Sequence, residues 1–195
     1  MADIYVSDAF GTVHRAHAST VGVAAYLPAV CGLLIEKELS VMGSALENPA
    51  RPFVAVLGGA KVSDKLGVVA NLIGKADAIL IGGGMAFTFL RAAGGEIGKS
   101  MCEADRLGYA REMLEQAKER GVKLLLPDDM LAADAFEATA IPMRVEAMHI
   151  PPELMGMDIG PKTAADFKAV IRDAGTVVWN GPMGAFEIEP FDVAT

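Results

Sequence analysis

The sequence predicts an open α/β fold, in which helices flank a parallel sheet whose carboxyl edge binds a ligand. Four short apolar runs are typical of strands that are buried on both faces: 53–57 (FVAVL), 78–81 (AILI), 122–126 (VKLLL) and 176–179 (TVVW). Amphipathic helical patterns separate these runs, and glycine-rich turns follow three of them. The alternation of strand and helix predicts right-handed crossovers between parallel strands.

Helices are expected over 63–73, 105–120 and 163–174, because each stretch has an apolar stripe at helical spacing and is followed by glycine. Ser63 and Thr163 are the expected N-caps of the first and third helices, since a short hydroxyl side chain can accept a free N–H group.

The first 50 residues have a different pattern and precede this series. A helical stretch there stops at Pro49 and leads into the first βα unit, as a connector between two lobes would. We therefore predict three parts: 1–30 as the end of a first lobe, 31–48 as an interdomain helix, and 49–195 as a second lobe.

Composition excludes several classes of protein. The net charge of −8 argues against a nucleic-acid binder, because such proteins neutralise phosphates with basic surfaces. No apolar run approaches the roughly 20 residues of a membrane span, and the stretch MADIYVSDAF lacks the features of a signal peptide. Cys31 and Cys102 match no metal or redox spacing and are expected to be buried thiols in a reducing cytosol. We expect a cytoplasmic protein without nucleic-acid or membrane partners.

Three strands end in glycine-bearing turns, at 57–61, 81–85 and 179–184. In an open parallel sheet these turns meet at one edge, where glycine lets a ligand approach the backbone and helix N-termini attract anions. A single such turn could simply end its strand. Three of them favour a shared ligand crevice.

Two common nucleotide motifs are absent from these turns. GGAKVSDK lacks the spacing of a P-loop, and GGGMAF has Phe87 where a dinucleotide fingerprint needs its third glycine. The acidic residue that this fingerprint requires after the second strand is also missing. A nicotinamide cofactor is therefore not expected.

Lys61 and Lys65 lie four residues apart, in the first glycine turn and at the start of the helix after it, so both can reach the same side. Two cations at a helix N-terminus are unfavourable unless an anion lies between them, and a phosphate chain would satisfy both. The alternative is a pair of solvated lysines at a helix end.

Taken in order, seven stretches resemble the phosphoglycerate kinase family closely along nearly the whole chain: SDAFGTVHRAHASTVGVA, RPFVAVLGGAKVSDKLGVV, ILIGGGMAFTFLRA, EIGKS, KLLLPDD, MGMDIGPKT and VVWNGPMGAFEIEPF. The resemblance implies a two-lobed enzyme of glycolysis with a Rossmann-like nucleotide-binding lobe. One lobe would bind 3-phosphoglycerate or 1,3-bisphosphoglycerate, and the other ADP or ATP with Mg²⁺. The reaction would be reversible phosphoryl transfer between the acyl phosphate and the nucleotide.

The resemblance also implies roles for particular residues. Phosphoglycerate would be bound by His14, Arg15 and His17, and the catalytic cations would be Arg15, Lys61 and Lys65. The nucleotide would contact the backbone or side chains of Gly59, Ala60, Lys61, Lys65, Gly83, Gly156, Met157, Asn180, Gly181 and Glu187. Within this set Lys61, Lys65, Asn180 and Gly181 would lie near the phosphates, Gly156 and Met157 at the adenine, and Glu187 at the ribose. Without the resemblance, the two histidines would be interpreted as ordinary surface or core residues, and Glu187 as a solvated acidic residue in a loop.

Against the family pattern, residue 1 falls near the end of the substrate lobe and residue 195 precedes a glycine turn whose aspartate meets the metal. We therefore expect no metal ligand in this chain. The parent protein is expected to be a monomeric kinase, whereas the 195 residues alone would bind nucleotide weakly, self-associate and show no turnover. Glu153, Leu154 and Ala194 depart from the family pattern near the adenine and near the chain's end.

Overall fold

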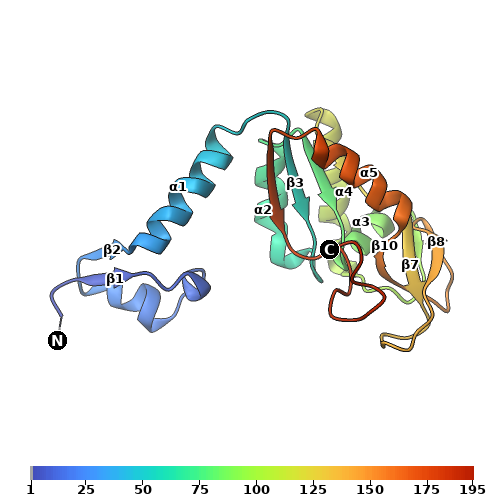
Figure 1. Ribbon diagram of the computed structural model, residues 1–195, viewed down its shortest axis with the longest axis horizontal. Helices are drawn as coiled ribbons and strands as arrows, with labels where there is room; N and C mark the ends of the chain where they lie inside the picture. Colours follow the sequence, from blue (N-terminus) through green and yellow to red (C-terminus); the bar gives the residue numbers. More distant parts are fainter. Residues whose placement is uncertain (1) are drawn as a thin grey trace. The chain divides into compact units, whose positions relative to one another are not determined.

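The structure is a computed structural model that describes residues 2–195. The chain divides into two compact units, Met1–Pro49 and Ala50–Thr195, and each is described by itself (Figure 1). None of the helices within residues 2–195 is long and apolar enough to cross a membrane.

Within residues 2–49 the first unit has two strands, β1 (Tyr5–Ser7) and β2 (Ala29–Cys31), and one α-helix, α1 (Leu33–Glu47). Three short helical turns lie between the strands: η1 (Phe10–Thr12), η2 (Ala18–Gly22) and η3 (Val23–Ala25). The Asp8 carboxylate begins α1, because it accepts the N–H groups of Leu34 at 2.9 Å and Ile35 at 3.0 Å. The helix expected over 31–48 is present as α1, and its role as an interdomain connector stays a prediction.

The second unit is built on a four-stranded parallel sheet of order β11-β3-β4-β6. Its strands are β3 (Phe53–Leu57), β4 (Ala78–Ile81), β6 (Lys123–Leu125) and β11 (Thr176–Asn180). Its helical segments are η4 (Ser63–Lys65), α2 (Leu66–Ile73), α3 (Met85–Ala92), η5 (Ala104–Arg106), α4 (Leu107–Glu119) and α5 (Pro161–Arg172). The predicted α/β fold with a parallel sheet is confirmed.

The order of these strands reverses at β3. The chain runs from β3 through β4 to β6 on one side, and β11 then pairs on the other side of β3. In Figure 1, α5 lies on one face of the sheet and α2 on the other. A reversal of this kind opens a crevice outside the carboxyl ends of the strands, where open α/β proteins bind ligands.

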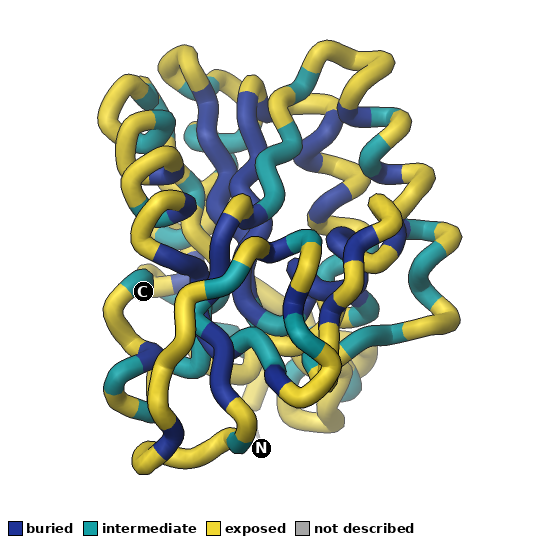
Figure 2. The backbone as a smooth tube through the Cα atoms, turned by 90° about the vertical axis from the view of Figure 1, so that its right-hand side faces the viewer, coloured by how far each residue is buried: buried dark blue, intermediate teal, exposed yellow. Residues whose placement is uncertain are grey.

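Every residue of the two central strands is buried, and so are seven of the eight residues of α3. Figure 2 shows this buried backbone inside a largely exposed outer layer. Val54 and Val56 belong to the same core cluster as Phe167 of α5. β11 is only partly covered and leaves Val177 and Trp179 exposed. The stability of the unit therefore depends mainly on apolar burial around β3, β4 and α3.

A second sheet, antiparallel and of order β10-β7-β8, was not predicted. Its strands are β7 (Asp129–Ala133), β8 (Met143–Glu146) and β10 (Met155–Ile159), and nearby β5 (Glu96–Ile97) pairs with β9 (His149–Ile150). All five strands are short; β7, β8 and β10 contain Asp, Arg or Gly, and β5 and β9 have only two residues each, so none forms a continuous apolar run.

Both expected N-caps were wrong. The α5 helix begins at Pro161 after Gly160. Its first free N–H groups donate to the Asp129 carboxylate of β7, from Lys162 at 3.2 Å and from Thr163 at 2.8 Å. The Ser63 hydroxyl likewise binds a distant carboxylate instead of a local N–H group. In both places a carboxylate from elsewhere in the fold replaces the local cap.

Candidate functional site

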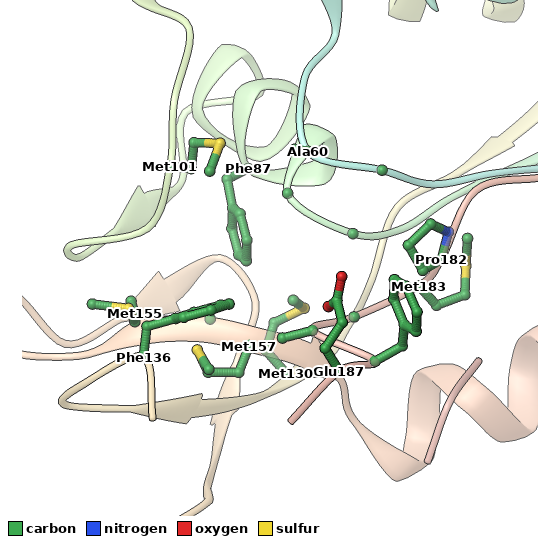
Figure 3. Close-up of a pocket in the computed structure, with 17 residues that line it drawn as sticks. Ala60, Phe87, Met101, Met130, Phe136, Met155, Met157, Pro182, Met183 and Glu187 are labelled. Atoms are coloured by element: carbon green, nitrogen blue, oxygen red, sulfur yellow. The ribbon is translucent and has the colours of Figure 1, made fainter. Parts of the chain in front are cut away.

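A pocket of about 430 Å³ lies at the carboxyl edge of the parallel sheet, where the strand order reverses (Figure 3). One part of its wall is formed by the turns after β3, β4 and β11, and another by β7 and β10 of the second sheet. The three glycine turns that the sequence predicts to share an edge therefore do share one cavity.

Backbone hydrogen bonds join these turns directly. The Gly59 N–H donates to the Pro182 carbonyl at 3.0 Å, and the Gly83 N–H donates to the Met183 carbonyl at 2.8 Å. Gly83 has φ +63°, and a Cβ atom there would lie 2.7 Å from Gly59 N and from Pro182 O. Only glycine fits this position, because the turns are packed backbone against backbone.

The lining is apolar and rich in sulfur. Five methionines line the pocket: Met101, Met130, Met155, Met157 and Met183. Phe87 and Phe136 add aromatic surface, and Glu187 is the one charged residue in the lining of the described pocket. In Figure 3 the Glu187 carboxylate points into the cavity. An apolar wall of this kind suits a flat base, while a carboxylate can accept hydrogen bonds from hydroxyl groups.

Lys65 adjoins the glycine turn, because a Cβ atom on Gly59 would lie 3.5 Å from its Cε. Its ammonium donates a hydrogen bond to Asn180 Oδ1 at the end of β11. Burial lowers the pKa of Lys65, and the nearby Asp64 carboxylate offsets part of this effect. Lys61 is exposed and forms no ion pair with any residue in 2–195.

Of the predicted nucleotide-binding residues, six line the pocket: Gly59, Ala60, Gly83, Gly156, Met157 and Glu187. Lys65 and Asn180 are hydrogen-bonded to each other, and Gly181 follows with its carbonyl accepting the Trp179 indole N–H at 2.8 Å. Their roles in binding stay predictions.

Several lining residues were missed. Phe87 counted only as a mismatch to the dinucleotide fingerprint, yet its ring lines the pocket and fills the space beside Gly156, where a Cβ atom would lie 2.3 Å from Phe87 Cζ. Met130 and Met155 lie on β7 and β10, the strands of the unpredicted sheet. The abundance of methionine was the signal available in the sequence.

His14, Arg15 and His17, the predicted phosphoglycerate residues, belong to the first unit and are all exposed. The Arg15 Nε–H donates to His14 Nε2 at 3.4 Å. The His17 backbone N–H donates to Thr20 Oγ1 at 3.1 Å, and this hydroxyl in turn donates to the Arg15 carbonyl at 2.5 Å. Thr20 therefore fixes the local backbone that presents the three side chains.

Asp158 is a buried carboxylate behind the pocket, with 1% of its surface exposed. It accepts the N–H groups of Ile159 at 2.8 Å and Ala194 at 3.1 Å. Burial, and to a smaller extent the nearby Asp192 carboxylate, raises the pKa of Asp158 to about 6 despite these hydrogen bonds. The folded protein therefore holds this proton more tightly than the unfolded chain does.

Because the pKa of Asp158 rises on folding, its protonation stabilises the fold as the pH falls through 6. From pH 8 to pH 5 the wild type should gain about 1 kcal/mol in unfolding free energy that Asp158→Asn does not gain. Urea denaturation of both proteins at four pH values in this range measures the difference. Parallel pH profiles for the two proteins would contradict this assignment.

The second unit therefore has a Rossmann-like α/β fold, and its pocket lies where the strand order reverses, which is the place where open α/β folds bind ligands. Comparison with known proteins is more specific. The sequence profile described as "Phosphoglycerate kinase" matches residues 1–195, and the chain belongs to this family.

Two curated relatives, both named phosphoglycerate kinase, are 57% identical: one from Clostridium novyi (strain NT) over 196 residues, the other from Chloroflexus aurantiacus over 195 residues. Each match covers 100% of this chain and 49% of the relative. The chain thus spans about half the length of the curated relatives it matches.

Two solved structures are also similar. Phosphoglycerate kinase from Coxiella burnetii superposes with a TM-score of 0.89 at 45% identity, covering 100% of this chain and 51% of that one. The enzyme from Pyrococcus horikoshii OT3 superposes with a TM-score of 0.83 at 31% identity, covering 99% and 49%.

Proposed function

We propose that this chain contributes the nucleotide-binding part of a phosphoglycerate kinase, which transfers a phosphoryl group reversibly between 1,3-bisphosphoglycerate and ADP. The observation that supports this best is the apolar pocket where the strand order reverses, bordered by three joined glycine turns and by Lys65. The reaction is inferred from the chain's membership of the phosphoglycerate kinase family.

In this proposal the adenine lies against Gly156 and Met157, where the apolar lining favours a flat base. The Glu187 carboxylate, which points into the cavity, accepts hydrogen bonds from the ribose hydroxyls. The phosphates extend toward Lys65 and Asn180, whose hydrogen bond already holds the ammonium beside the glycine turn.

The catalytic roles follow from charge. Phosphoryl transfer needs positioning and stabilisation of the charge on the migrating group, with little covalent participation by the protein. Lys61 and Lys65 supply cations on the nucleotide side. Arg15, with His14 and His17, binds the phosphoglycerate.

We propose that Mg²⁺ enters the site bound to the nucleotide substrate. Within residues 2–195 no group of three or more His, Cys, Asp or Glu side chains is arranged to hold a metal ion. Mg²⁺ commonly keeps several waters and is bound through substrate phosphates with one or two carboxylates. The phosphate oxygens of ADP would then be its main ligands beside this pocket.

We propose a cytoplasmic location. We also propose small-molecule partners only, because the net charge of −8 does not favour nucleic-acid binding. Self-association of the 195-residue chain and its lack of turnover stay predictions. Large exposed apolar side chains, including Tyr26 and Leu33 of the first unit, are consistent with self-association.

Calorimetric titration of the 195-residue chain with Mg-ADP tests the proposed function, with NAD⁺ as the control nucleotide. We expect saturable 1:1 binding of Mg-ADP and none of NAD⁺ at the same concentration, because the pocket lacks the dinucleotide fingerprint. Failure to bind Mg-ADP, or tighter binding of NAD⁺, would overturn the proposal.

A further inference from the structure

The Glu103 carboxylate reaches across to the turn that contains the two lysines. Glu103 lies in the loop before α4, 40 residues along the chain from Ser63. The Ser63 N–H donates to Glu103 Oε2 at 3.0 Å, and the Ser63 hydroxyl donates to Oε1 at 2.6 Å. Both carboxylate oxygens therefore hold one residue, and the nucleotide roles described above do not use this contact.

Glu103 is itself fixed at its backbone. Its N–H donates to the Thr88 hydroxyl at 3.2 Å, and its carbonyl accepts the Arg106 N–H at 2.9 Å. Thr88 is buried in α3, the helix that begins directly after the glycine turn of β4. Glu103 thus ties the β3 turn to the helix of the β4 turn.

Ser63 lies midway between Lys61 and Lys65, two residues from each. The turn around it is short, since η4 has three residues, and the Lys65 N–H donates to the Val62 carbonyl at 2.9 Å. A turn of this length has few hydrogen bonds of its own. A contact from outside the turn that holds Ser63 therefore fixes the backbone from which the Lys61 and Lys65 side chains extend.

The anchor also changes how an anion can bind here. A carboxylate already occupies the Ser63 N–H, so this N–H is not available to a phosphate, contrary to the expectation from helix N-termini. The hydrogen bond from the Ser63 hydroxyl lowers the pKa of Glu103, although burial opposes this effect. The backbone N–H groups of Ser63 and Val62 and the charge of Lys61 lower the pKa further. A phosphate chain must then rely on the lysine ammonium groups, whose positions depend on the turn.

We propose that Glu103 is a positioning residue for phosphate binding: by holding Ser63, it directs Lys61 and Lys65 toward the same phosphate chain. This inference rests on the proposed nucleotide site. Two effects of Glu103 oppose each other, because its charge repels phosphate while its hydrogen bonds hold the lysines in place. Since the carboxylate is partly exposed and its repulsion is screened by solvent, the positioning effect is expected to dominate.

Two variants separate these effects. Glu103→Ala removes both the charge and the hydrogen bonds, whereas Glu103→Gln removes the charge and keeps an oxygen that can accept the Ser63 N–H. We expect Glu103→Ala to weaken Mg-ADP binding about 10-fold and adenosine binding less than about 2-fold. Glu103→Gln should stay within about 3-fold of the wild type for both ligands, and Ser63→Ala should lie between the two variants.

Calorimetry measures these affinities, and hydrogen exchange of the Ser63 amide reports the anchor without any ligand. The Ser63 amide should exchange faster in Glu103→Ala than in Glu103→Gln, while melting temperatures show that both variants fold. Unchanged Mg-ADP affinity in Glu103→Ala, or equal losses for Mg-ADP and adenosine, would overturn the inference alone. A wild type that does not bind Mg-ADP would overturn it together with the proposed function.

Discussion

Replacing Lys65 with alanine should weaken Mg-ADP binding by about 10- to 100-fold and leave adenosine binding nearly unchanged. The ammonium lies beside the Gly59 turn and is held by Asn180, so it faces the proposed phosphates and not the base. A charge-assisted hydrogen bond of this kind contributes about 1.5–3 kcal/mol. Lys61→Ala should act in the same direction.

Lys118→Ala is the matched control for Lys65→Ala. Lys118 is an exposed lysine in the last turn of α4, which leads into the amino end of β6, at the edge of the sheet opposite the pocket. Its replacement should leave both affinities unchanged. If Lys65→Ala loses affinity equally for Mg-ADP and adenosine, the substitution disturbs the fold and the assignment of Lys65 to the phosphates is contradicted.

Replacing Asp129 with alanine should lower the free energy of unfolding by about 3 kcal/mol, because it leaves several buried donors without an acceptor. Asp129 is buried and accepts hydrogen bonds from the Lys162 N–H, from the N–H and hydroxyl of Thr163, and from Arg144 Nε at 2.7 Å. It joins β7 to both β8 and the start of α5. Asp129→Asn, which keeps one acceptor oxygen, should lose less.

The stability that Asp129 contributes should depend on pH in a definite direction. Burial raises the pKa of Asp129, but the hydrogen bonds from Thr163, Lys162 and Arg144 outweigh it and lower the pKa below the ordinary carboxyl value. The stability contributed by Asp129 is therefore present above the unfolded pKa of about 4 and lost as the pH falls. Urea denaturation at pH 7 and pH 3.5 should show a smaller difference between wild type and Asp129→Ala at the lower pH. If the difference in unfolding free energy between the two proteins is the same at both pH values, the ionised carboxylate stabilises the fold no more than the protonated form does.

The sequence alone determined the parallel sheet and the edge of it that forms the pocket. The strands β3 and β4 are buried on both faces, so their residues form continuous apolar runs that are visible without any structure. Glycine follows β3, β4 and β11, and parallel strands bring their carboxyl ends to one edge, so Gly59, Gly83 and Gly181 were predictable as neighbours.

The tertiary structure alone decided the opposite wall of the pocket and the anchors of its turns. The strands of the second sheet mix apolar residues with Asp, Arg and Gly, and they become strands through pairing with one another and not through local preference. The carboxylates of Asp129 and Glu103 reach Thr163 and Ser63 from 34 and 40 residues away. The local sequence pattern predicts a hydroxyl cap at both places. This prediction fails because folding brings a carboxylate, which is a stronger acceptor, to N–H groups of these helix starts.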